Sequence, residues 1–227
     1  MARNGIWLDD YWLLLMQLYL QKPVGVKPLY HRGLVDLSLE LHISPQTLQA
    51  RMKRLERLET PRIERLWRTY SNDTKRLKRA VHLLRSMNGF GDAEQFYDGV
   101  EVQETFEREF RPVCPVNKDV AEKDRPLEQR VTPAMLAMIL NLYFQLTPST
   151  MVSETPEVRA LARLLGIPAA DVVQVLDIYQ ACDPYLGRDM MVVSPLLLPC
   201  QQMWQRFGNH EPDELQIYAE ELEEYFR

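Results

Sequence analysis

Residues 34–58, LVDLSLELHISPQTLQARMKRLERL, predict two short helices joined by a three-residue turn. The first helix has one apolar stripe at helical spacing, formed by Leu34, Leu37 and Leu41. Ser44 and Pro45 suit the start of the second helix, because the hydroxyl accepts a backbone N–H there and proline has no N–H to leave unpaired. The second helix then buries the stripe Leu48, Met52 and Leu55.

The same pattern returns 124 residues later in residues 158–182, VRALARLLGIPAADVVQVLDIYQAC, and the two stretches align without a gap. The apolar positions of the first copy are again apolar in the second, where they hold Leu161, Leu165, Ile167, Val172 and Leu176. Gly166 falls where the turn is expected to need a left-handed residue. His42 holds that place in the first copy, and histidine tolerates this conformation more often than most residues. We therefore predict an internal duplication.

Residues 161–176, LARLLGIPAADVVQVL, resemble the helix-turn-helix signature of bacterial DNA-binding domains. The resemblance covers only the repeated stretch of each half, and it implies a fold more strongly than a function, because many winged-helix and related modules bind only protein. It implies an all-α protein of two tandem helix-turn-helix, winged-helix-like domains. Residues 60–70 show no alternating strand pattern, so we expect the hairpin wing to be rudimentary or absent.

Domain boundaries follow from composition. Residues 111–131 hold three prolines, many charges and little periodicity. We predict a basic domain over 1–112, a linker over 113–131 and an acidic, degenerate domain over 132–227. Three of the Thr-Pro pairs are expected to start helices, namely Thr60-Pro61, Thr132-Pro133 and Thr155-Pro156. A further helix is expected from Asp92 to Phe110, and a short extended piece at Met190–Val193.

Charge separates the two halves. Residues 1–113 contain 18 Lys and Arg against 15 Asp and Glu, whereas residues 114–227 contain 9 against 17. Within 46–85 the count is 12 basic against 4 acidic residues. The overall net charge of −5 therefore hides a basic patch on the first half, which favours an anionic partner there.

The second helix of a helix-turn-helix lies in the major groove of DNA, and its early residues reach base edges. Gln46, Thr47 and Gln49 hold these positions, and glutamine can form two hydrogen bonds with adenine. Basic side chains further along suit phosphates, namely Lys53, Arg54, Arg57, Lys75, Lys78 and Arg79. We predict these nine residues as a DNA-binding site. The alternative is a protein-interaction or structural module in which the basic helix pairs with acidic residues of the second half.

The matching surface of the second copy has a different chemistry. Its residues are Ala169, Ala170, Asp171, Val173, Gln174 and Asp177, which would repel phosphate. We therefore expect the second domain to contact another copy of the chain or another protein.

Catalytic, cofactor and metal motifs are missing from the sequence. The glycine-rich stretch 88–91, NGFG, lacks the lysine of a phosphate loop, and the four histidines and three cysteines lack metal-ligand spacing. We expect a non-catalytic protein without cofactor or metal, although an enzyme whose pocket is assembled across the fold stays open. The start of the chain has no signal-peptide layout and no apolar stretch is long enough to span a bilayer, so a cytoplasmic protein without a membrane partner is expected.

Overall fold

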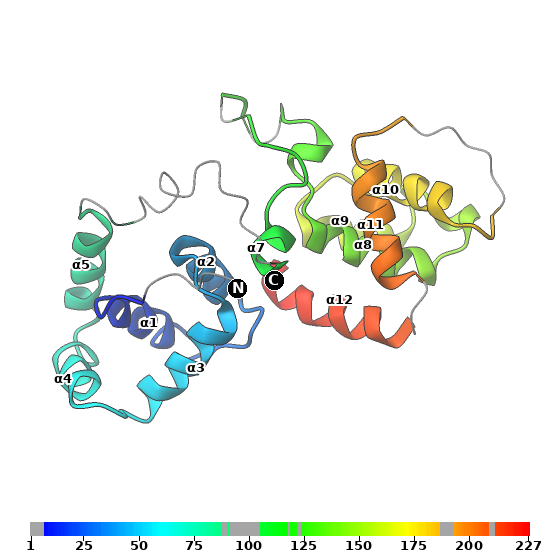
Figure 1. Cartoon of the computed structure of the whole chain (residues 1–227). Coiled ribbons are helices and arrows are strands. Elements are labelled where there is room, and N and C mark those ends of the chain that lie inside the picture. Colours follow the sequence, from blue (N-terminus) through cyan, green and yellow to red (C-terminus); the bar gives the residue numbers. More distant parts are fainter. Residues whose placement is uncertain are drawn as a thin grey trace. The chain divides into compact units, whose positions relative to one another are not determined.

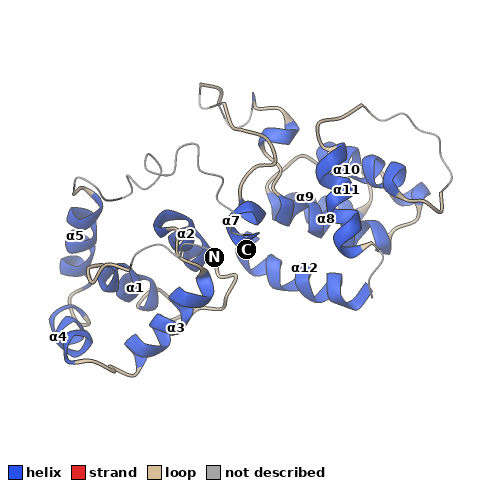
Figure 2. Cartoon of the chain, viewed as in Figure 1, coloured by secondary structure: helices blue, strands red, loops and turns tan. Residues whose placement is uncertain are grey.

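The computed structural model describes residues 7–87, 90, 105–117, 119–121, 124–186, 193–208 and 212–227. This part of the chain consists of helices and loops without a strand, which confirms the all-α prediction (Figure 2). None of its helices is both long and apolar enough to cross a bilayer. Most of the helix expected over 92–110 and most of the extended piece at 190–193 lie outside the described residues.

Contacts divide the chain into two compact units between Glu104 and Thr105. The first unit is built around α1 (Tyr11–Tyr19), which is buried on nearly every side and contributes Trp12, Leu14, Leu15, Met16 and Leu18 to the core. Four helices surround it, α2 (Arg32–Leu41), α3 (Pro45–Glu56), α4 (Pro61–Tyr70) and α5 (Thr74–Arg85) (Figure 1). The helices packed most closely on α1 are α5 and α3.

α2 and α3 are joined by the predicted three-residue turn. His42 has φ 53° and ψ 36°, which is the left-handed conformation expected at this position. The side chain of Ser38 donates to the carbonyl of Ile43 at 2.5 Å and braces the turn. The hydroxyl of Ser44 accepts the backbone N–H of Thr47, and α3 begins at the next residue, as predicted. The predicted inner stripe of α3 is fully buried and comprises Leu48, Met52 and Leu55.

α4 occupies the place where a winged helix would carry its hairpin. Thr60 accepts the backbone N–H of Ile63 at 3.3 Å and starts a helix rather than a strand. The ring of Trp67 packs edge-on against Tyr19 of α1, with centroids 5.7 Å apart. Among the described residues the first unit therefore has a fourth helix and no wing.

The second unit is built around α8 (Pro133–Gln145), in which Leu136, Ile139 and Leu140 are fully buried. It packs against α7 (Thr105–Phe110), α9 (Pro156–Leu165), α10 (Ala169–Cys182), α11 (Leu197–Phe207) and α12 (Pro212–Phe226) (Figure 1). Gly166 between α9 and α10 has φ 69° and ψ 25°, so the second turn also has the expected left-handed residue. Two short 3-10 helices span Leu127–Gln129 and Pro148–Thr150.

The segment expected as a linker differs from the prediction. Val113 donates its backbone N–H to Val131, and Cys114 donates to Glu128, each at 3.0 Å. Leu127 and Val131 are buried. The described residues of 113–131 thus belong to the second unit, and the division of the chain lies before the boundary predicted at 112. No sequence pattern indicates this packing, because irregular backbone packs without a periodic apolar pattern.

Candidate nucleic-acid interface

The outward face of α3 is a single exposed stripe, which we call the α3 surface. It consists of Gln46, Ala50, Lys53 and Arg54, followed by the capping residue Arg57, and the exposed Glu56 borders it. The spacing places these residues above one another along one side of the helix, opposite the buried stripe. Arg57 is the more exposed of the two arginines on this surface, with 71% of its side chain exposed against 46% for Arg54.

One carboxylate compensates part of the charge on the α3 surface. Glu59 lies 2.9 Å from Nε of Arg54 and 3.7 Å from Nη1 of Arg57. Exposed ion pairs of this kind contribute about 0–1 kcal/mol, so a phosphate could replace the carboxylate at little cost. Within the described part of the chain, Lys53 makes no ion pair. Its charge is therefore available to a ligand.

Two of the predicted base-reading residues have structural roles instead. Nε2 of Gln49 donates to the backbone carbonyl of Lys27 at 3.0 Å. Oγ1 of Thr47 lies 2.9 Å from Oγ of Ser44, next to the helix cap. Gln46 is exposed at the start of α3 and is left as the side chain best placed to meet a base edge.

Lys27 connects α3 to the loop that precedes α2. The sequence did not reveal this role. Its side chain is almost fully buried, and Nζ donates to the carbonyls of Gln21, at 2.7 Å, and Pro23. Burial lowers the pKa of this ammonium group. Its backbone N–H meets the sulfur of Met52 at 3.3 Å. A lysine in a loop rich in proline and glycine is normally exposed, so no sequence signal pointed to this contact.

Arg51 borders the α3 surface. Its guanidinium lies 4.0 Å from the centre of the Trp7 ring, within the range of a cation–π contact. Burial lowers the pKa of this group, and the neighbouring charge of Arg54 acts in the same direction. Arg51 is thus held by the core and is a poorer candidate for a phosphate contact than Lys53 or Arg57.

The remaining predicted residues lie elsewhere in the unit. Lys75, Lys78 and Arg79 are exposed on α5 and make no ion pair with any residue described. α1 lies between α5 and α3 and packs against both (Figure 1). The nine predicted residues therefore form two surfaces, because periodicity shows which face of a helix is exposed but not where the helix lies in the fold.

The described residues contain no candidate metal site. They include no group of three or more His, Cys, Asp or Glu side chains placed to hold a metal ion. The second unit has a pocket whose lining includes Arg108, Arg111 and Arg206. Comparisons of the chain with family models, with curated proteins and with solved structures found no match.

Proposed function

We propose that the first unit is a helix-turn-helix domain that binds duplex DNA, with α3 in the major groove. The observation that carries the proposal is the α3 surface, an exposed stripe that starts with a glutamine and continues with lysine and arginine. In this arrangement Gln46 reaches a base edge, and Lys53 and Arg57 bind phosphates. The left-handed turn and the Ser44 cap set the direction in which α3 leaves α2.

We further propose that the two units descend from one duplicated domain. α9 begins and ends 124 positions after α2, and α10 begins 124 positions after α3. The left-handed residues of the two turns, His42 and Gly166, have the same spacing. On α10 the positions that match Gln46 and Lys53 hold Ala170 and Asp177. The second unit would then have kept the fold and changed its surface for protein contacts.

The salt dependence of DNA binding tests the role of α3 in the full chain. We expect affinity for a labelled duplex, measured by fluorescence anisotropy, to fall steeply with salt as counterions are released. The double variant Lys53→Ala, Arg57→Ala should flatten the slope of log K against log salt by about 2. The matched control, Lys75→Ala with Lys78→Ala, removes the same charge from α5 and should leave the slope nearly unchanged.

Two outcomes would argue against the proposal. If the α5 variant lost the slope and the α3 variant kept it, the DNA interface would lie on α5. If the full chain bound no duplex at low salt, the first unit would instead be a protein-interaction module. The pairing of Glu59 with both Arg54 and Arg57 favours that second candidate, since it neutralises part of α3 without a ligand.

A further inference from the structure

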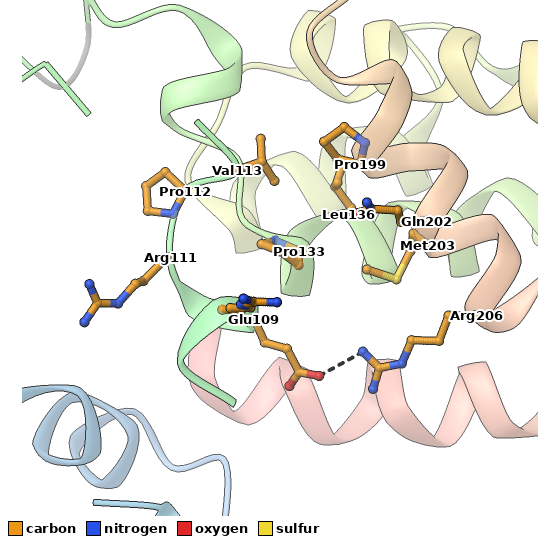
Figure 3. A pocket seen from close by; sticks show the side chains of 11 residues that line it. Glu109, Arg111, Pro112, Val113, Pro133, Leu136, Pro199, Gln202, Met203 and Arg206 are labelled. Atoms are coloured by element: carbon orange, nitrogen blue, oxygen red, sulfur yellow. Dashed lines mark hydrogen bonds and ion pairs between the residues drawn. The ribbon is translucent and has the colours of Figure 1, made fainter. Parts of the chain in front are cut away.

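The second unit contains a pocket of about 470 Å³, formed by α7, the segment after it, the start of α8, and α11 (Figure 3). Apolar side chains supply most of its wall, namely Val113, Pro133, Leu136, Pro199 and Met203. Sites for small organic molecules commonly have volumes of about 300–1,000 Å³ and mainly apolar walls with a few polar groups. The size and lining of this pocket fit that class of ligand.

A partly buried ion pair lies at one end of the pocket. Glu109 and Arg206 point toward each other, with Oε1 and Nη1 2.9 Å apart (Figure 3). The side chain of Glu109 is only 10% exposed, whereas that of Arg206 is 45% exposed. A guanidinium has five N–H donors, and this carboxylate uses part of them. The guanidinium also lies 4.8 Å from the centre of the Phe207 ring and 5.3 Å from that of Tyr218. Arg206 is therefore held in place, and the donors that these contacts leave can meet a ligand.

Two further arginines line the pocket, and they differ in role. Arg111 points away from the other labelled side chains and pairs with the buried Glu107 at 2.9 Å (Figure 3). Arg108 is exposed and makes no ion pair with any described residue. Since Arg206 is paired with Glu109 and Arg111 with Glu107, Arg108 is the arginine of the lining whose charge no described carboxylate compensates. This positive excess beside an apolar wall favours an anion over a neutral or cationic ligand.

We propose that this pocket binds a small organic anion with an apolar body. The anionic group would accept hydrogen bonds from Arg206 and Arg108, and the apolar body would lie against Pro133 and Pro199. A carboxylate or sulfonate suits the planar donor fork of a guanidinium. The proposal concerns the second unit alone and does not depend on DNA binding by the first.

A pair of fluorescent probes tests the proposal on the full chain. Anilinonaphthalene sulfonate carries an anionic group on an aromatic body, and phenylnaphthylamine has the same body without the charge. We expect saturable binding of the sulfonate, at least about tenfold tighter than that of the neutral probe. Octanoate should displace the bound sulfonate, whereas octanol at the same concentration should not.

Substitutions on α11 locate the site. Gln202 lines the pocket and is exposed, so Gln202→Trp should fill the space and weaken sulfonate binding about tenfold or more. Gln201 is exposed on the same helix and does not line the pocket, so Gln201→Trp should bind as the parent does. Arg206 is not substituted, because its removal would leave the buried carboxylate of Glu109 without its ion-pair partner. Equal binding of the two probes, or equal effects of the two tryptophan substitutions, would overturn the proposal.

Discussion

Replacing Leu48 by alanine should lower the free energy of unfolding of the first unit by about 2–5 kcal/mol. Leu48 lies on the inner face of α3, is fully buried, and belongs to the same core cluster as Leu15 and Leu34. Truncation removes its apolar contacts and leaves a cavity that close-packed neighbours can fill only in part. The loss should be seen in urea denaturation, and in faster hydrogen exchange of the amides of α1, α2 and α3.

Gln46→Ala is the matched control, because Gln46 is exposed on the same helix. It should change the stability by less than about 0.5 kcal/mol. A Leu48→Ala variant as stable as this control would mean that α3 does not pack through its apolar stripe. The α3 surface, which we assign to DNA, would then not be the outward face of the helix.

Cys200 should react with iodoacetamide about a thousand times more slowly in the folded chain than in the chain unfolded in urea. Burial raises the pKa of its thiol from 9.0 to about 12, and the nearby Cys182 adds to the shift, while a hydrogen bond with Tyr179 opposes it. A raised pKa favours the thiol, and only the thiolate is nucleophilic. Each tenfold fall in the thiolate fraction therefore lowers the alkylation rate about tenfold. The side chain is also fully buried, which hinders access of the reagent.

Mass spectrometry of the alkylated peptides measures this difference and includes an internal comparison. Cys114 is partly exposed and should be modified well before Cys200 in the folded chain. Alkylation of both cysteines at similar rates, without denaturant, would contradict the packing of α11 against α10. The rates should converge once urea unfolds the second unit.

Local sequence signals predicted the parts of the fold that depend on neighbouring residues. Three Thr-Pro pairs predict helix starts, and α4, α8 and α9 begin at their prolines, Pro61, Pro133 and Pro156. The left-handed conformation was expected at His42 and Gly166, and both residues adopt it. Caps and tight turns are set within a few residues, so their sequence patterns carry over to the structure directly.

Contacts between distant residues could not be predicted in the same way. Glu109 and Arg206 are 97 positions apart, and no pattern in either segment predicts their ion pair. Gln49 was assigned to bases because of its place in the motif, whereas the structure engages it with the carbonyl of Lys27. In both cases the partner is chosen by tertiary packing, which periodicity does not encode.

The assignment of α3 to the major groove is tested most directly by photo-crosslinking. A photoreactive side chain placed at position 46 of the full chain should form an adduct with the bases of a duplex, and the yield should fall as salt rises. The same group at position 83 serves as the control, because Leu83 is 64% exposed on α5. We expect an adduct from position 46 and little or none from position 83. Adducts from position 83 alone, or none from position 46 at low salt, would contradict DNA binding through α3.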